Sequence, residues 1–195
     1  MMTRKSIGVV VLTSGLASGA LVAGLALPAA AAPATAAKVA AVTAPRAPAV
    51  TLKAWPVLRQ GTNSTWPKAT VRSLQYLLDA HGAKVPADGV FGAKTKAAVV
   101  AFQRARHLTA DGVAGAQTWG ALITTVKLGS TGYAVRAVQD QADYRIARYH
   151  YSIAVDGIFG PTTQLFTRAF QLSAGLASDG VVGALTWRAL VTEAE

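Results

Sequence analysis

Apolar residues recur every three to four positions in six stretches of the chain, a spacing typical of amphipathic α-helices. The two longest faces are Val71, Leu74, Leu77 and Leu78, and Val135, Val138, Ala142, Ile146 and Tyr149. Two further faces are Ala98, Val99, Phe102 and Ala105, and Phe166, Ala169 and Phe170. The two short stretches pair a tryptophan with a leucine one turn later, Trp119 with Leu122 and Trp187 with Leu190. This pattern predicts an all-α fold with both of these tryptophans in the core.

Polar turns separate the predicted helices, and four of them share the phrase D-G-(V/I)-x-G-x-x-T. The copies start at Asp88, Asp111, Asp156 and Asp179, at intervals of 23, 45 and 23 residues. The Asp side chain can accept a backbone N–H two residues on, and the first Gly takes a positive φ at little cost. The second Gly fits a helix N-cap, and Pro161 fits a first helical position, where its missing N–H is not needed. The Thr falls in the first turn, where free amides need partners. Each phrase therefore predicts a turn that starts a helix.

The second half of the chain repeats the first. An offset of 68 residues places Leu58 on Val126, Phe102 on Phe170, Trp119 on Trp187 and Leu122 on Leu190. Between residues 71 and 75 the offset is 64, so the first unit carries four extra residues around 62–70. The second unit recovers them between residues 139 and 156, and this register indicates an internal duplication. Because four residues are about one helical turn, we expect the first helix of the second unit to be one turn longer.

Residues 1–31 are predicted to be a secretory signal peptide. Arg4 and Lys5 precede an uncharged stretch over residues 7–27, and three alanines at 29–31 supply a cleavage site. An uncleaved membrane anchor is the alternative, since this stretch approaches the length of a bilayer span. Residues 32–54 are rich in Ala and Pro and predict a disordered linker. The remainder forms two domains, residues 55–125 and 126–195. Each is near the lower size limit for a stable core, which favours packing of one on the other.

The chain is basic and lacks cysteine. Its formal net charge is +10 at pH 7, and +8 remains without Arg4 and Lys5. A basic exported protein is attracted to polyanions, such as anionic wall polymers. The basic residues are scattered, so we expect no nucleic acid as a partner. The absence of cysteine excludes disulfides, thiolate nucleophiles and cysteine–zinc sites. We expect a monomer without stable membrane insertion once the signal is cleaved.

Side chains for catalysis are few. The only glutamates are Glu193 and Glu195, at the C-terminal end. A glycan-cleaving pair of carboxylates would therefore need aspartates. The aspartates outside the four turns are Asp79, Asp140 and Asp143. The histidines, which lack a metal-binding spacing, are His81, His107 and His150. Each Asp-Gly is followed by an apolar residue and lacks the alternating oxygen ligands of a calcium loop. We expect no enzymatic activity, no metal and no cofactor.

Five motifs recur in the same order in both units. The first unit has V-R-S-L-Q-Y-L-L, D-G-V-F-G-A-K-T, A-F-Q-R, D-G-V-A-G and T-W-G-A-L. The second has V-R-A-V-Q, D-G-I-F-G-P-T-T, A-F-Q-L, D-G-V-V-G and T-W-R-A-L. In order and spacing they resemble the peptidoglycan-binding domain of bacterial cell-wall hydrolases, over roughly residues 55–191. The resemblance implies a three-helix bundle for each unit and non-catalytic attachment to the wall. Two departures are an insertion with Trp66-Pro67 and a Gln141-Ala142 pair where that family has leucine. The second departure questions ligand binding by the second unit more than its fold.

Sugar-binding surfaces combine aromatic faces with polar groups. The D-G-x-F-G turn and the helix before it supply both kinds. The predicted ligand-binding residues are Arg72, Gln75, Asp88, Gly89, Phe91, Arg136, Gln139, Asp156, Gly157 and Phe159. The arginines would pair with carboxylates of the wall. The alternative is structural, with the phenylalanines in the core and the glutamines bonded to backbone groups. Further candidates are the tyrosine- and arginine-rich stretch 143–152, and Trp55 and Trp66.

Together these features predict a secreted, cell-wall-associated, non-catalytic protein that binds peptidoglycan through two tandem modules. Two weak sites on one chain would gain residence time on a polymer with repeating ligands. Two other functions stay open. One is a regulator or inhibitor that docks on a cell-wall hydrolase, and the other is a short lytic enzyme that uses aspartates.

Overall fold

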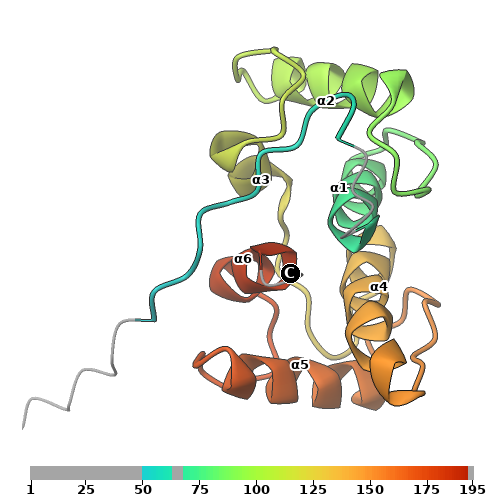
Figure 1. The fold of residues 1–195 in the computed structure, drawn as a ribbon, viewed down its shortest axis with the longest axis vertical. Coiled ribbons are helices and arrows are strands. Elements are labelled where there is room, and N and C mark those ends of the chain that lie inside the picture. The colour runs from blue at the N-terminus through green and yellow to red at the C-terminus, as the bar shows by residue number, and fades with distance from the viewer. Residues whose placement is uncertain (1–49, 63–67, 193–195) are drawn as a thin grey trace, which may run out of the picture. The chain divides into compact units, whose positions relative to one another are not determined.

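The computed structural model describes residues 50–62 and 68–192. The predicted signal peptide, most of the predicted linker and Trp66 lie outside these residues. The helices are α1 (Lys68–Ala80), α2 (Ala93–Ala105), α3 (Ala116–Leu122), α4 (Tyr133–Ile146), the 3₁₀ turn η1 (Ala147–Tyr149), α5 (Pro161–Ser173) and α6 (Ala184–Thr192). Three helices belong to each repeat, α1 to α3 in the first module (residues 55–125) and α4 to α6 in the second (residues 126–195) (Figure 1). The predicted all-α fold with two tandem modules is confirmed.

The same long-range contacts occur twice, with an offset of 68 residues. An isolated antiparallel bridge joins Leu58 to Ala114 in the first module, and its counterpart joins Val126 to Val182 in the second. Both tryptophans of the short helices are fully buried. The Trp119 indole N–H donates to the carbonyl of Pro56 at 2.8 Å, and the Trp187 indole N–H donates to Thr124 at 2.7 Å. The predicted core position of these tryptophans is confirmed, and each buried indole donor has a partner.

The helix faces follow the predicted periodicity except at three exposed residues, Ala105, Ala169 and Tyr149. Val99, Phe102 and Phe170 are buried, whereas Ala105 and Ala169 are exposed. The prediction that these two alanines belong to the buried faces is therefore wrong. Alanine is apolar but costs little free energy when exposed, so a hydrophobic pattern cannot tell the edge of a face from its centre.

The helical stretch that begins the second module is longer than α1, as expected, but its last turn is the 3₁₀ turn η1. Helix α4 has 14 residues against 13 in α1, and the chain continues only as the short turn η1, where Tyr149 is 61% exposed. In both modules a helix carboxylate accepts a backbone N–H from the segment that follows. Asp79 accepts from Val85 at 2.7 Å, and Asp143 accepts from Ile153 at 3.0 Å. The first bond spans six positions and the second spans ten, so the four added residues lie between Asp143 and Ile153.

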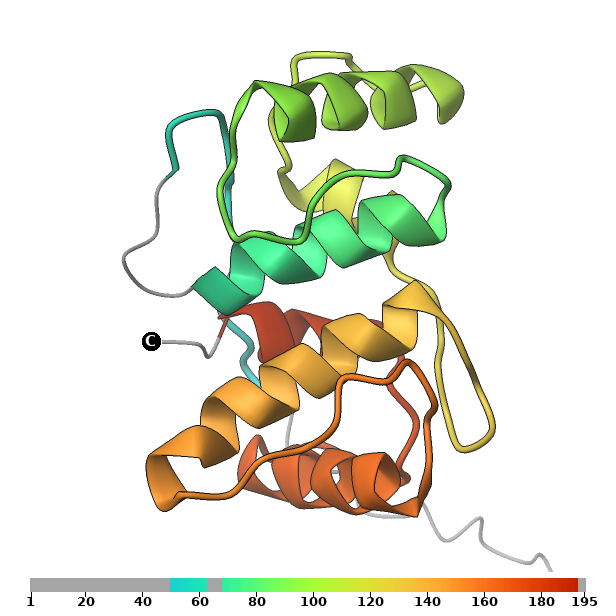
Figure 2. The same cartoon turned by 90° about the vertical axis from the view of Figure 1, so that its right-hand side faces the viewer.

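The two modules pack on each other through α1 and α4, which lie side by side (Figure 2). Both carboxylate oxygens of Asp140 share the single Arg72 Nε–H, at 2.8 and 2.9 Å. Next to this pair, Gln141 Nε2 donates to the Ser73 hydroxyl at 3.0 Å, and both side chains are fully buried. Burial raises the pKa of the Asp140 carboxyl above its ordinary value, and the Arg72 guanidinium offsets this only in part. The contact between modules is therefore a desolvated, hydrogen-bonded interface.

The last residues of the predicted linker belong to the folded unit. Arg188 on α6 donates to the carbonyls of Lys53 and Leu52, at 2.6 and 2.9 Å. The Leu52 side chain packs against the core. Leu52 and Lys53 are thus bonded to the second module before the chain enters the first.

Candidate functional site

The turn phrase is completed by a glutamine from the preceding helix, and we call this arrangement a glutamine clasp. In the first clasp, the Gln75 amide N–H₂ lies 2.8 Å from Asp88 Oδ1 and 3.1 Å from the Val90 carbonyl. Its Oε1 accepts the Gly89 N–H at 2.9 Å, and Asp88 Oδ1 accepts the Val90 N–H, also at 2.9 Å. The Thr95 hydroxyl, 3.2 Å from the Gln75 amide nitrogen, caps the set. A buried side-chain amide thereby satisfies backbone groups that the turn leaves unpaired.

The clasp occurs four times with nearly constant geometry. The glutamines are Gln75, Gln103, Gln139 and Gln171, all at most 2% exposed. Their Nε2 to Asp Oδ1 distances are 2.8, 2.8, 2.7 and 2.8 Å. Their Oε1 to Gly N distances are 2.9, 2.9, 2.8 and 2.9 Å. The predicted Asp-Gly turn is confirmed in all four copies, and in each a bond to the residue two positions on is present.

The clasp also sets the charge state of the turn. In all four aspartates the pKa lies below its ordinary value, chiefly because the carboxylate accepts the backbone N–H two residues on. The hydrogen bond from the glutamine is the second cause. Hydrogen bonds to the ionised form favour that form. The four turn aspartates therefore stay ionised to a lower pH than free aspartates do.

Most of the ten predicted ligand-binding residues serve the two clasps that contain phenylalanine. Phe91 and Phe159 are 1% exposed and lie in the core. Gln75 and Gln139 are bonded within their clasps, Gly89 and Gly157 are buried at positive φ, and Asp88 and Asp156 are exposed at the turn surface. These contacts are the structural roles that the sequence left open as the alternative. Ligand binding by this set stays a prediction.

The two predicted arginines occupy different environments although they match in the repeat. Arg72 is committed to Asp140 in the interface between the modules. Arg136 is exposed, and its guanidinium lies over the Tyr133 ring at 5.6 Å. It also covers Gly157, where a Cβ would approach Arg136 Nε to 3.1 Å. Of the two arginines, Arg136 is the more exposed.

The other aromatic candidates divide between core and surface. Trp55 is partly buried and stacks on Trp119, with 6.0 Å between centroids and 14° between planes. In the stretch 143–152, Tyr149 and Tyr151 are 61% and 72% exposed. His150 is exposed in a left-handed conformation, with φ of +61°. The two tyrosines are therefore the accessible rings of that stretch.

The aspartates outside the turns all have structural partners. Asp79 and Asp143 accept backbone N–H groups, and Asp140 accepts Arg72. Within the described part of the chain, no group of three or more His, Asp or Glu side chains is placed to hold a metal ion. Across the same residues, no helix has the length and hydrophobicity needed to cross a membrane.

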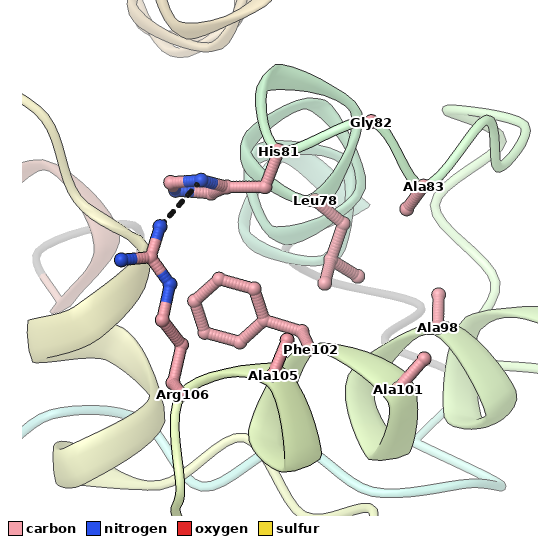
Figure 3. Close-up of a pocket in the computed structure, with 9 residues that line it drawn as sticks. All are labelled: Leu78, His81, Gly82, Ala83, Ala98, Ala101, Phe102, Ala105 and Arg106. Atoms are coloured by element: carbon pink, nitrogen blue, oxygen red, sulfur yellow. Dashed lines mark hydrogen bonds between the residues drawn. The ribbon is translucent and has the colours of Figure 1, made fainter.

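A pocket that the sequence did not point to lies in the first module between α1 and α2 (Figure 3). It measures about 650 Å³, within the range of small-molecule sites. Its lining residues are Leu78, His81, Gly82, Ala83, Ala98, Ala101, Phe102, Ala105 and Arg106. Leu78 and Ala83 face Ala98 across the opening, and the Phe102 ring lies between them and the charged end.

His81 and Arg106 form the polar end of this pocket. Arg106 Nη2 lies 3.1 Å from His81 Nδ1, and His81 Nε2 lies 2.9 Å from the Leu122 carbonyl. Because a guanidinium only donates, Nδ1 accepts and Nε2 carries the proton that goes to Leu122. The Arg106 guanidinium also lies over the Phe102 ring, 5.3 Å from its centroid. A position-by-position comparison of the two repeats could have pointed to Arg106, because its counterpart in the second module is an alanine, Ala174.

The fold and its four clasps define a class of protein, a tandem of small helical modules built around D-G turns. Residues 67–122 and 131–190 match the family described as "Putative peptidoglycan binding domain". The chain therefore belongs to this family and carries two of its domains, as the sequence motifs predicted. The domains indicate a cell-wall location.

Two relatives resemble part of the chain. A zinc D-Ala-D-Ala carboxypeptidase of Streptomyces albus G is 40% identical over 73 residues, which cover 36% of this chain and 26% of that protein. An uncharacterised protein of Kitasatospora aureofaciens is 42% identical over 60 residues, which cover 31% of this chain and 49% of that protein. The chain thus spans about a quarter and about half of the length of these relatives. No solved structure matches the chain.

Proposed function

We propose that the chain is a secreted, non-catalytic protein that attaches to the peptidoglycan of the bacterial cell wall. The observation that carries this proposal is the presence of two domains of the peptidoglycan-binding family. They pack directly on each other through α1 and α4. The net positive charge adds attraction to anionic wall polymers, which salt would screen.

The non-catalytic part of the proposal rests on how the carboxylates are used. A glycan-cleaving pair needs two carboxyl groups that face one bond. The seven aspartates instead accept hydrogen bonds from glutamine amides, backbone N–H groups or Arg72. The similarity to the carboxypeptidase covers 26% of that protein. It therefore supports a shared module and does not extend to the activity in that protein's name.

Co-sedimentation with purified wall sacculi tests this function. The chain from Ala32 onward would be mixed with sacculi, with and without their anionic polymers, at low and at high salt. Retention on stripped sacculi at high salt is the expected result. Loss under those conditions would show that charge alone holds the protein to the wall. Recovery of a hydrolase from wall extracts without glycan would favour a docking regulator instead.

Release of dye from labelled sacculi tests the non-catalytic part. No release above a heat-treated control is expected. Release that disappears in an aspartate variant would contradict the proposal.

A further inference from the structure

The two modules differ most where the pocket of the first module lies. By the repeat register, Ala98 corresponds to Phe166, Arg106 to Ala174 and Ala105 to Ser173. In the second module the Phe166 ring stacks on Phe170, with 6.0 Å between centroids and 13° between planes, and packs against the core. A large ring therefore stands where the first module has only a methyl group.

The residue of the second module that corresponds to His81 also makes contacts within its own module. In the second module this position is Arg145, which donates to the Leu190 carbonyl at 2.7 Å, as His81 does to Leu122. The Arg145 guanidinium lies 4.9 Å from the Phe170 centroid. It thus occupies the place over the ring that Arg106 takes in the first module. The second module fills with its own side chains the space that the first leaves open.

The two modules also differ in their net charge. Residues 55–125 contain eight Lys and Arg against three Asp, whereas residues 126–195 contain six against six Asp and Glu. The pocket therefore lies in the cationic module. Among the described residues Arg106 takes part in no ion pair, and its side chain is exposed. An anionic ligand would meet an uncompensated guanidinium at the end of an apolar pocket.

The lining defines what such a ligand must offer. The alanines and Leu78 accept small apolar groups, and the Phe102 ring gives a flat apolar surface. Arg106 offers planar N–H donors that match a carboxylate. His81 fixes the guanidinium from behind through its Nδ1 acceptor. Methyl side chains beside a free carboxylate fit this combination, whereas a neutral sugar would leave the guanidinium unpaired.

We infer that the first module alone carries the ligand pocket, and that the pocket takes a peptide stem of peptidoglycan through an alanyl methyl group and its adjacent free carboxylate. Arg106 holds the carboxylate, and the wall of alanines beside Phe102 holds the methyl group. The second module supports α1 through α4, and in it Phe166 and Arg145 fill the corresponding space. This inference rests on the proposed function and assigns its ligand class. It replaces two equal weak sites with one specific site.

Two variants of the full chain from Ala32 onward test the assignment. Arg106→Gln removes the cation at an exposed position. Ala98→Phe combined with Leu78→Ala gives the first module the residues that the second has at these positions, Phe166 and Ala142. The control is Arg168→Gln, an equal loss of charge on an exposed residue of the second module. Far-ultraviolet circular dichroism and melting temperature confirm that each variant is folded.

Binding is measured with stripped sacculi at high salt, and by NMR titration with soluble disaccharide-peptides. Arg106→Gln should weaken binding about ten-fold or more, since a charge-assisted bond to carboxylate is lost. The double variant should abolish binding, and Arg168→Gln should bind as the parent does. A disaccharide-peptide with its terminal carboxylate amidated should bind the parent and Arg106→Gln alike.

The outcomes separate this inference from the proposed function. If the parent protein does not bind stripped sacculi, the proposed function itself fails. If the parent binds and both pocket variants bind equally well, the function stands and the pocket assignment is overturned. If shifts on titration cluster around Tyr149 and Tyr151 instead of His81 and Ala98, the ligand lies on the second module and the assignment is likewise wrong.

Discussion

Replacing Gln103 by leucine would test whether the glutamine clasp holds the fold together. Gln103 is 2% exposed, and its Oε1 accepts the buried Gly112 N–H at 2.9 Å. Its Nε2 lies 3.0 Å from the Val113 carbonyl and 2.8 Å from Asp111 Oδ1. Leucine has a similar size but no polar atoms, so the variant removes these hydrogen bonds without opening a large cavity.

The magnitude follows from the groups left behind. A buried N–H without a partner costs roughly 1–3 kcal/mol, and Gly112 loses its acceptor completely. The Val113 carbonyl still accepts a hydrogen bond from the Thr118 hydroxyl at 3.3 Å. Losing its bond to Gln103 therefore costs less free energy, about 1 kcal/mol. Asp111 is exposed and regains water, so it adds no further cost. Gln103→Leu should therefore lower the free energy of unfolding by about 2–4 kcal/mol.

Urea unfolding followed by tryptophan fluorescence measures this loss. Gln171→Leu is the matched variant in the second module, since its bond to the Gly180 N–H is also 2.9 Å. Both variants should lose a similar amount. The pKa of Asp111 should rise toward its ordinary value in Gln103→Leu, but only in part, because the larger cause, the bond from the Val113 N–H, remains. A loss below about 1 kcal/mol with an unchanged pKa of Asp111 would refute the reasoning.

Three further predictions concern the interface and the turns. Arg72→Met should cost about 2–3 kcal/mol at pH 7 in urea unfolding, because Asp140 stays buried without its partner. Without Arg72 the folded pKa of Asp140 should rise further, so the electrostatic penalty should be absent below the folded pKa of the parent and complete above that of the variant; a cost independent of pH would contradict this. Gln141→Leu with Ser73→Ala removes a buried Oε1 that has no partner, and should leave stability unchanged or raise the urea midpoint, whereas a clear drop would show that the polar contact stabilises the fold. The four turn aspartates have lowered pKa values, so their stabilisation is present above the unfolded value of about 3.9 and is lost as pH falls through the folded values. A urea midpoint that stays constant from about pH 5 to about pH 2 would be inconsistent with that linkage.

Local features were predictable from the sequence. The Asp-Gly turn, the glycine before each helix and Pro161 at the first position of α5 act within a few residues, and the structure has them as expected. The glutamine of each clasp was harder to place, because it comes from the preceding helix, 8 to 17 positions before its aspartate. The motif order identified the family, and the periodicity identified the core tryptophans. These features depend on short-range geometry and on burial, and both leave a pattern in a single sequence.

Features that depend on how one repeat meets the other were not predictable. Arg72 and Arg136 match in the repeat, yet only Arg72 meets a carboxylate. The reason is that Asp140 on α4 has Tyr76 as its counterpart on α1, so the pairing of these helices cannot be symmetric. The stacking of Trp55 on Trp119, a long-range contact within the first module, was likewise not predictable. Repeat symmetry in sequence therefore overstates symmetry in the structure.

The residues at which the second module differs from the first fall into two groups, and both groups can be explained by the same role. Asp140 and Gln141 differ from their counterparts Tyr76 and Leu77, and both supply polar contacts to α1. Phe166 and Ala174 differ from Ala98 and Arg106, and together they replace a charged pocket by packed apolar side chains. Burial of the first group of side chains costs desolvation free energy. A free-standing module would not recover this cost, because these side chains find partners only across the interface. The second group removes an exposed cation while it adds core. A module altered in both ways is suited to hold its neighbour in place, which is why a single pocket on the first module explains the divergence better than two equivalent sites.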